Sequence, residues 1–533
     1  MIQSYLKPLR VLFIASVLMV SCNEQNLVQN SPPPIDSQAI DISTKEKGQQ
    51  RDIIEGEYIV TYKDQFEGRI SENIALQADL RTDQILSSLN IKEDSVLNRY
   101  KYALKGFAAR LTKNQVELLK LDPRVERVTP NERFYLSAIV SESASSNHTV
   151  TFMGQTTPWG VTRVGGAQNG SGKKAWIIDS GIDLNHPDLV VDISNSVSFI
   201  ATESADDGYG HGTHVAGIIA ALNNSSQVVG VAAGATVVAV KACYNDPFLG
   251  CPVSSIVNAI DYVSIKASPN DIVNMSLGGI SSITDIDDAV TAAANAGIRF
   301  SIAAGNSASN ASNFTPARVN NSNVWTVSAF RQGDQFVQTF DWNTPNCNPF
   351  QSPYVGSNFS NPPVDFSGPG ESVLSLWKNG GTLTTCGTSM AAPHIAGLLL
   401  ASPNQIVTDG YVTNDPDGNS DPIAAFPVLD APSIFALVVN GKPKLSWSTV
   451  QYADSYKIYR RIENGNWSWI GSVTTTTFTD NTKYSANMSV LFGIPIEWDD
   501  ILSYKIKATA SGLDDSPYSN ISYFDESGGG PIQ

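Results

Sequence analysis

The chain has few cysteines, a deficit of positive charge and, at its amino terminus, only a short apolar run. Its 533 residues include 5 cysteines, and 35 lysines and arginines stand against 51 aspartates and glutamates. The formal net charge of −16 argues against nucleic acid and anionic membrane surfaces as electrostatic partners. The run from Val11 to Val20 is too short to span a bilayer. An acidic surface of this kind favours solubility outside the cell.

The amino terminus has the layout of an export signal. Lys7 and Arg10 precede the apolar run, and Ser21 and Cys22 follow it. The end of the signal resembles the lipobox of bacterial lipoproteins, in which the cysteine is lipidated. We therefore expect a signal peptide over residues 1–21 and a lipid anchor at Cys22, which holds the chain to the outer membrane or cell surface. Release after processing and ordinary secretion are the alternatives. A flexible tether over 22–52 follows.

Three short segments carry an aspartate, a histidine and a serine in the chain order of a hydrolytic triad. The first two segments supply the acid and the base. In AWIIDSGID, Asp179 follows an apolar run that predicts a buried parallel strand, so the carboxylate lies at the strand's carboxyl end. In GHGTHVAG, His211 stands between two glycines and opens an apolar stretch that predicts a buried helix. A histidine there acts as a general base if a third group fixes its tautomer, and Asp179 is that group.

The third segment, GTSMAAPHIAG, carries the nucleophile. Gly387 permits a tight turn, and a helix is expected to begin at Thr388 or Ser389 and to run to Leu400. The backbone N–H of Ser389 would then be directed at an oxyanion. A GTS tripeptide by itself more often caps a core helix, but its two companions favour the catalytic interpretation.

Other interpretations of these residues carry less weight. His211 and His214 have the spacing of two metal ligands on one helical turn, yet no third ligand is evident. Asp179 is followed by Ser180 and Gly181, so it could also be an ordinary turn residue. Gly172 and Lys173 precede a strand instead of following one, which argues against a phosphate-binding loop.

With NMSLGG at 274–279 and AAGN at 303–306, these segments resemble the subtilisin-like serine proteases, or subtilases, and most closely their proteinase K-like branch. The resemblance implies an α/β domain with a mostly parallel sheet and helices on both faces. It also implies that Asp179 orients His211, that His211 is the base and Ser389 the nucleophile, and that Asn306 is a side-chain donor of the oxyanion hole. The implied substrate-binding residues are Ser276, Leu277, Gly278, Ala304 and Gly305. Without the resemblance, central strands are predicted at Asp271 to Met275 and at Ile298 to Ala304. Asn306 alone would be interpreted as a turn residue.

Residues 53–137 are expected to form a small α+β unit of two strands and two helices. The strands are Tyr58 to Tyr62 and Phe107 to Leu111, and the helices are Ile74 to Leu89 and Lys113 to Leu121. GEYIVTYKD, ALKGFAARLTKNQVELLK and VERVTPNERF resemble the subtilase propeptide, an intramolecular inhibitor. An unrelated small domain is the alternative. A processing linker is expected over 138–157, and self-cleavage between about Leu136 and Thr157.

The peptidase domain is expected over 158–403 and a polar linker over 404–426. The stretch from Asp341 to Pro353 reads as an extra loop. In an exported protein the four cysteines of this domain imply disulfides. We expect Cys243 to pair with Cys251, and Cys347 with Cys386, out of three pairings that four cysteines allow.

Residues 427–525 change to short alternating strands, which predicts an all-β sandwich, followed by a tail over 526–533. The strands are expected at Pro443 to Trp447, Ser455 to Arg460, Trp467 to Val473, Tyr504 to Ala510 and Ser519 to Tyr523. LSW, YKIYRR, TTFTD and YKIKA resemble a fibronectin type III module with Trp447 and Tyr504 as core anchors. A carbohydrate site at Trp467 and Trp469 is the alternative.

Together these features predict a self-processed serine endopeptidase that acts on protein or peptide substrates. The chemistry needs no cofactor. Structural calcium is an expectation of the resemblance. The aspartate-rich loops, Asp206 with Asp207 and Asp415 to Asp421, are equally compatible with solvated turns, and neither has the spacing of a standard calcium loop. An esterase or amidase that uses the same triad, and a catalytically silent binding lipoprotein, are the competing hypotheses.

Overall fold

The computed structural model describes residues 52–63, 72–136, 154–279, 283–340, 356–402, 406–427, 429, 431–439, 442–462, 465–482, 502–510 and 516–524. The signal peptide, Cys22, most of the tether and of the linker 138–157, Cys347 and the carboxyl-terminal tail lie outside these residues. Within them, no helix is both long and apolar enough to cross a membrane.

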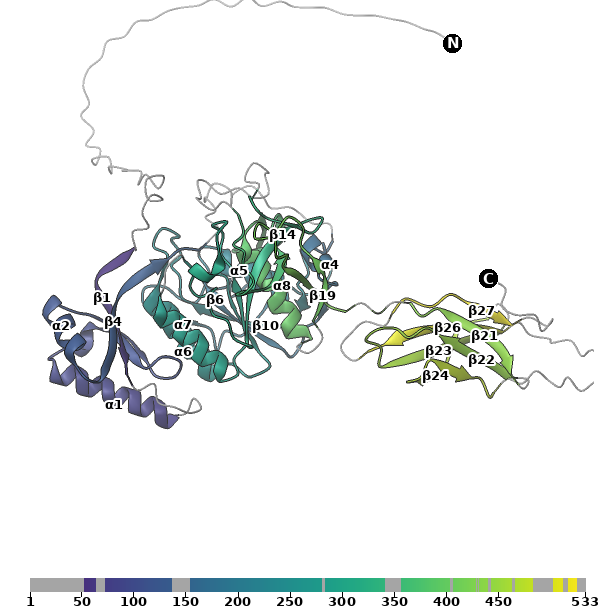
Figure 1. Ribbon diagram of the computed structural model, residues 1–533, viewed down its shortest axis with the longest axis horizontal. Coiled ribbons are helices and arrows are strands. Elements are labelled where there is room, and N and C mark those ends of the chain that lie inside the picture. The colour runs from purple at the N-terminus through teal and green to yellow at the C-terminus, as the bar shows by residue number, and fades with distance from the viewer. Residues whose placement is uncertain are drawn as a thin grey trace, which may run out of the picture. The chain divides into compact units, whose positions relative to one another are not determined.

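The amino-terminal unit is a small α+β domain (Figure 1). Its elements are β1 (Ile53–Tyr62), α1 (Glu72–Ser88), the 3-10 turn Glu93–Ser95, β2 (Val96–Tyr100), β3 (Gly106–Arg110), α2 (Lys113–Leu121) and β4 (Val125–Phe134). The strands pair antiparallel in the order β4-β1-β3-β2. At the start of α2, Thr112 and Gln115 form a capping box, which explains why this helix begins where the sequence predicts.

Alternate residues of the amino-terminal sheet face two different cores, because successive side chains of a strand point to opposite faces. Val60 and Phe107 pack with residues of α1 and α2. Ile59 and Ala108 belong to a cluster that also contains residues of α6 (Val253–Lys266) and α7 (Thr284–Asn295). The sheet is therefore covered by its own helices on one face and by α6 and α7 on the other.

The prediction of only two strands in this unit was wrong. β2 and β4 are the additional strands, and β4 carries the charged and polar run ERVTPNER. This run lacks the alternation of apolar and polar residues that predicts a strand. Its place in the sheet comes from backbone pairing with β1 on one side and with the short strand β11 (Cys251–Pro252) on the other.

The second unit is built on a mostly parallel sheet, as predicted, and this sheet has eleven strands. The order is β19-β20-β16-β14-β13-β12-β6-β10-β7, with β15 paired to β14 and β8 to β10. Their bounds are β6 (Lys174–Asp179), β7 (Val190–Val191), β8 (Val197–Ser198), β10 (Thr236–Lys241), β12 (Ile272–Met275), β13 (Phe300–Ala303), β14 (Val324–Arg331), β15 (Gln335–Phe336), β16 (Val364–Pro369), β19 (Val407–Tyr411) and β20 (Pro422–Ala425). Around them lie α4 (Trp159–Arg163), the pair β5 (Gln168–Asn169) and β9 (Ala232–Ala233), the 3-10 turn Ala311–Asn313 and the hairpin of β17 (Val373–Trp377) and β18 (Gly381–Thr385).

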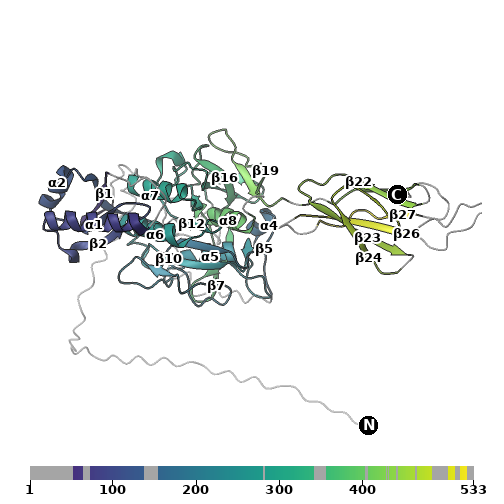
Figure 2. The same ribbon diagram turned by 90° about the horizontal axis from the view of Figure 1, so that it is seen from below.

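Helices cover both faces of this sheet (Figure 2). On β6, Ala175 and Ile177 pack in a cluster with α5 (His211–Ala220) and α8 (Thr388–Ala401). Trp176 and Ile178 pack on the opposite side with α6 and α7. A strand buried on both faces needs a continuous apolar run, which explains the sequence AWII before Asp179.

The expectation of a polar linker over 404–426 was also wrong. β20 pairs parallel with β16, and β19 pairs antiparallel with β20, so this segment forms the edge of the large sheet. Most of β19 is exposed, and its sequence VTDGY is polar, as is common for an edge strand that contributes backbone groups more than side chains.

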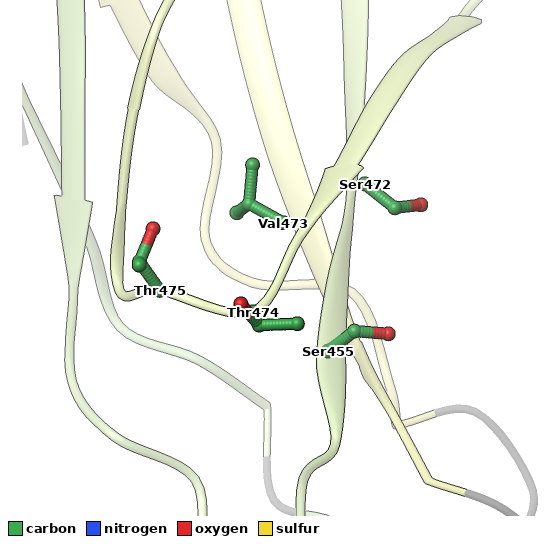
Figure 3. A pocket seen from close by; sticks show the side chains of 5 residues that line it. All are labelled: Ser455, Ser472, Val473, Thr474 and Thr475. Atoms are coloured by element: carbon green, nitrogen blue, oxygen red, sulfur yellow. The ribbon is translucent and has the colours of Figure 1, made fainter.

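The carboxyl-terminal unit is a β-sandwich. One sheet has the order β21-β22-β25 and the other β24-β23-β26-β27. The strands are β21 (Ile434–Val439), β22 (Lys442–Trp447), β23 (Ser455–Ile462), β24 (Ser468–Val473), β25 (Thr477–Thr479), β26 (Leu502–Thr509) and β27 (Ser522–Phe524), two more than predicted. Trp447 and Tyr504 lie in its core, as expected, and Trp469 is exposed. An open hollow of about 410 Å³ is lined by Ser455, Ser472, Val473, Thr474 and Thr475 (Figure 3).

Candidate active site

Asp179 and His211 form a buried pair at the carboxyl end of β6. His211 Nδ1 lies 2.8 Å from Oδ1 and 3.0 Å from Oδ2 of Asp179, and both side chains are fully buried. Because carboxylate oxygens only accept hydrogen bonds, the pairing assigns the proton to Nδ1 and leaves the lone pair on Nε2. That Nε2 is buried and has no hydrogen-bond partner among the described residues. The arrangement suits a general base that awaits a proton.

Backbone bonds and one ring hold this pair in place. The carbonyl oxygen of Asp179 accepts from the backbone N–H of Ala242 at 2.9 Å and of Cys243 at 3.2 Å. The backbone N–H of Ser180 donates to Asp179 Oδ1 at 2.7 Å. On the face of the imidazole, the ring of Tyr209 stacks nearly parallel, with 6.3 Å between centroids. The orientation of both catalytic candidates is therefore fixed before any substrate arrives.

Ser389 is the second residue of α8, the helix that the sequence predicts. Gly387 has a φ of +139°, a conformation that side chains disfavour, and it turns the chain into the helix. The hydroxyl of Ser389 donates to the carbonyl oxygen of Ser276 at 3.1 Å, and Ser276 Oγ donates to the carbonyl oxygen of Ser389 at 2.7 Å. α8 packs against α5, the helix of His211. Ser389 Oγ is thus directed at the segment after β12 and makes no hydrogen bond to His211 Nε2.

Asn306 is anchored beside the same helix start. Its Oδ1 accepts from the backbone N–H of Thr388 at 2.8 Å and from Thr388 Oγ1 at 2.9 Å. These two bonds identify the end of the amide that accepts. The other end, Nδ2, is the donor of this side chain. Ala304 and Gly305 come before Asn306 at the end of β13, and Asn358 fixes both through bonds of 2.8 Å to their carbonyl oxygens.

The end of the amino-terminal unit runs between two segments of the sheet unit. Phe134 pairs antiparallel with Cys251, and Tyr135 forms an antiparallel bridge with Gly278. Phe134 is buried and lies against Gly279, where an added Cβ would come within 2.7 Å of the ring. Gly278 and Cys251 therefore each face an extended segment of the amino-terminal unit.

Comparisons with known proteins agree with this geometry. Residues 170–404 match the Subtilase family, and residues 57–137 match Peptidase inhibitor I9. The cuticle-degrading protease of Metarhizium anisopliae is 32% identical over 368 residues, which are 66% of this chain and 80% of the relative. Subtilisin-like serine protease AsES of Sarocladium strictum is 31% identical over 405 residues, 70% of this chain and 89% of the relative. Proteinase R of Parengyodontium album is 30% identical over 387 residues, which are 69% of this chain and 84% of the relative.

The chain belongs to the subtilase family. It is a subtilisin-like serine protease with an I9-type inhibitor propeptide, which confirms the predicted fold and enzyme class.

The propeptide of this subtilase is held by carboxylates of the peptidase domain. Asp261 of α6 accepts the backbone N–H groups of Lys101, Tyr102 and Ala103 at 2.7 to 3.0 Å. Asp285 of α7 accepts from Thr61 Oγ1 and Arg127 Nε, at 2.9 and 2.8 Å, and from Thr129 Oγ1 at 2.5 Å. Both carboxylates are buried.

One predicted disulfide lies beside the site. Cys243 and Cys251 are bonded, as expected, and they connect the end of β10 to β11. The sulfur of Cys386 accepts from the backbone N–H of Ser372 at 3.0 Å. Because Cys347 lies outside the described residues, its pairing with Cys386 stays a prediction.

Two further histidines, His214 and His394, are buried near His211. His214 Nε2 bonds to the carbonyl oxygen of Leu383 at 3.0 Å, and burial lowers the pKa of His214 to about 3. Burial likewise lowers the pKa of His394 to about 4. In the described part of the chain no three His, Cys, Asp or Glu side chains lie together as metal ligands. The carboxylates of Asp415 and Asp417 accept backbone N–H groups of their own loop.

A different set of oxygen atoms was missed by sequence reasoning. The buried Asp188 has an unpartnered Oδ2, and its Oδ1 accepts from Asn224 Nδ2 at 2.6 Å. Gln155 Nε2 donates to the carbonyl oxygens of Leu222 and Val228, at 2.7 and 3.2 Å. Burial raises the pKa of Asp188 to about 6. Two of these groups are backbone carbonyls. Every residue has a backbone carbonyl, so the sequence does not indicate which of them could bind a cation.

Proposed function

We propose that this subtilase is an exported serine endopeptidase in which Ser389 is the nucleophile, His211 the general base and Asp179 the group that orients the base. The observation that carries the proposal is the buried Nε2 of His211, which has no partner among the described residues while Asp179 holds Nδ1. Ser389 Oγ leaves the carbonyl oxygen of Ser276 and attacks the scissile carbonyl carbon as its proton passes to Nε2. The imidazolium gives that proton to the leaving amine, and water repeats the sequence to release the acid.

The oxyanion is stabilised by Asn306 Nδ2 and the backbone N–H of Ser389. The two bonds from Thr388 to Asn306 Oδ1 support this role, since they fix the amide at the start of the serine helix. A donor that is already oriented costs no reorganisation when negative charge develops on the carbonyl oxygen.

The first substrate is the chain's own propeptide junction, and the pairing register indicates the bond. Tyr135 lies opposite Gly278 in an antiparallel arrangement, so each step toward Ser276 is matched by one step toward the carboxyl end of the propeptide. We infer that this register continues for two more residues, which would bring residue 137 opposite Ser276, whose carbonyl oxygen accepts the Ser389 hydroxyl. We infer that the cut falls between Ser137 and Ala138, both outside the described residues. The released propeptide then remains as an inhibitor.

Protein and peptide substrates bind in the same way as the propeptide tail. Ser276, Leu277 and Gly278 pair with an extended backbone, and Ala304 and Gly305 form the wall beside the side chain that precedes the cut. A small-ester or amide substrate would need no such pairing. Hydrolysis of casein against hydrolysis of a blocked amino-acid ester separates the peptidase from the esterase alternative.

The remaining parts of the chain deliver the enzyme. The signal over 1–21 and a lipid at Cys22 place it at the outer membrane or cell surface of a bacterium. The carboxyl-terminal sandwich is a fibronectin type III-like module, supported by its two antiparallel sheets and by the core residues Trp447 and Tyr504.

A structural calcium ion fits the oxygen atoms around Asp188. The buried, unpartnered Oδ2 lacks a counter-charge, and the amides of Gln155 and Asn224 can each turn by 180° to present oxygen to the same centre. With the carbonyl oxygens of Leu222 and Val228 they supply the all-oxygen ligand set that Ca²⁺ prefers. The ion would stabilise the loop 222–228 and would take no part in the chemistry.

The experiment compares the chain without its signal as wild type and as Ser389→Ala. Wild type is expected to separate into a propeptide and a mature protease that begins at Ala138 and hydrolyses casein. Ser389→Ala is expected to stay whole and folded, because the nucleophile is absent. Equal cleavage of both proteins would contradict self-processing, and casein hydrolysis by Ser389→Ala would contradict the nucleophile. Edman sequencing, intact mass and circular dichroism give the readouts.

A further inference from the structure

A second buried carboxylate, Asp207, lies at the start of the helix that carries His211. It is 3% exposed and precedes α5 by four residues. Its Oδ1 accepts from Ser180 Oγ, Tyr209 N and Gly210 N at 2.9, 3.1 and 2.7 Å. Its Oδ2 accepts from Thr213 N and Thr213 Oγ1 at 2.9 and 2.6 Å. Both oxygens are thus surrounded by donors, the environment of an ionised carboxylate.

These bonds tie Asp207 to both members of the Asp179–His211 pair. Through the N–H groups of Tyr209, Gly210 and Thr213 it fixes the turn on which the His211 imidazole stands. Through Ser180 it reaches the other member, because the backbone N–H of Ser180 donates to Asp179 Oδ1 at 2.7 Å. Ser180 Oγ also accepts from the N–H of Gly212 at 3.0 Å, the residue that follows His211.

Hydrogen-bond donors and one buried cation oppose the effect of burial on Asp207. Burial raises the pKa of Asp207, while the hydrogen bonds from Thr213 and Gly210 and the ammonium of Lys241 oppose that shift. Lys241 is fully buried and lies directly opposite Asp179 on β10. Its ammonium bonds to the carbonyl oxygen of Ser180 and to Asn245 Oδ1, and it lies 3.2 Å from Glu203 Oε2.

The position of His211 in α5 means that a second negative charge nearby would stabilise its protonated form. His211 is the first residue of that helix, where the partial positive charge of the helix terminus disfavours a cation. The imidazolium that forms during acyl transfer is such a cation. A carboxylate that caps the same terminus offsets this effect as well as fixing the backbone.

We propose that Asp207 is a positioning residue of the protease: its ionised carboxylate holds His211 and Asp179 in register and stabilises the imidazolium through the start of α5. The proposal rests on the role of His211 as the base. Asp207 does not touch substrate, so its effect is expected in the rate of chemistry and not in binding. A residue that only stabilises the fold would change the amount of active enzyme and leave the turnover per active site unchanged.

The test compares Asp207→Asn with Asp206→Asn, the neighbouring exposed carboxylate, whose Oδ1 accepts the backbone N–H of Leu184 at 3.1 Å. A fluorophosphonate titrates the competent serine sites, and kcat and KM on a peptide substrate are expressed per titrated site. Asp207→Asn is expected to lower kcat by about tenfold to a hundredfold with KM within about twofold, the scale of a misplaced catalytic group. The acid limb of its kcat/KM profile is expected at lower pH, because a negative charge near the imidazolium is gone. Asp206→Asn is expected to match wild type in both.

A second variant keeps the proposal testable if Asp207→Asn does not fold. Ser180→Ala retains the carboxylate and its bonds to the helix start but removes the link toward Asp179. It is expected to lower kcat by several-fold with KM unchanged. An unchanged kcat per titrated site in either folded variant would overturn the proposal. If wild type fails to react with the reagent, the assignment of the triad fails instead, and the two failures are distinguishable.

Discussion

The variant Asp285→Asn in the isolated mature protease should bind the free propeptide much more weakly. Asp285 is fully buried in the complex and accepts from Thr61, Thr129 and Arg127 of the propeptide. Asparagine has the same shape but loses the charge and one acceptor, which leaves a buried donor unsatisfied. A lost hydrogen bond to a charged group costs about 1.5 to 3 kcal/mol and an unpaired buried group adds to it, so we expect about 2 to 4 kcal/mol. The inhibition constant should rise by roughly 30-fold to 1,000-fold.

Asp288→Asn is the matched control for this measurement. Asp288 lies on the same helix and pairs with the same Arg127 at 2.7 Å, but its side chain is 48% exposed. Exposed ion pairs contribute about 0.2 to 1 kcal/mol, so inhibition should weaken by no more than about fivefold. Inhibition constants are measured with purified propeptide on both variants, with melting temperatures to show that each protease is folded. Equal losses for Asp285→Asn and Asp288→Asn would refute the argument from burial.

Two further predictions concern the oxyanion hole and the calcium site. Asn306→Asp keeps the oxygen that accepts from Thr388 but removes the Nδ2 donor, and kcat should fall by about a hundredfold to a thousandfold with little change in KM. If KM rises while kcat is retained, Asn306 acts in binding and the assignment is wrong. Added Ca²⁺ should raise the melting temperature at pH 8, and this gain should vanish below pH about 6, because the pKa of Asp188 is raised to about 6 and the ion must then displace a proton. The gain should be absent at every pH in Asp188→Asn, and a gain that survives that substitution would place the ion elsewhere.

The sequence predicted those features in which side-chain identity and apolar runs carry the information. Asp179, His211 and Ser389 each follow from a local pattern: a buried strand that ends in a carboxylate, a glycine-flanked histidine that opens an apolar helix, and a glycine turn before a helix. The structure brings Asp179 and His211 together and places Ser389 at the start of a helix that packs on α5.

Features that depend on the backbone could not be predicted in the same way. β4 and β19 have polar sequences, and their places follow from pairing with β1 and β20. The carbonyl oxygens of Leu222 and Val228 belong to residues whose side chains indicate nothing about a cation. Asp207 was read as part of an aspartate-rich loop, because five donors converge on it only once β6, the turn before α5 and the first turn of α5 come together.

The most direct test of the account is the site at which a fluorophosphonate becomes attached to the mature protease. Peptide mass spectrometry should find one adduct, on Ser389, and the adduct should be absent from His211→Ala, because the hydroxyl reacts only when a base takes its proton. Pre-incubation with the free propeptide should prevent the reaction. An adduct on another residue, or equal labelling of Ser389 in His211→Ala, would contradict the assignment of nucleophile and base.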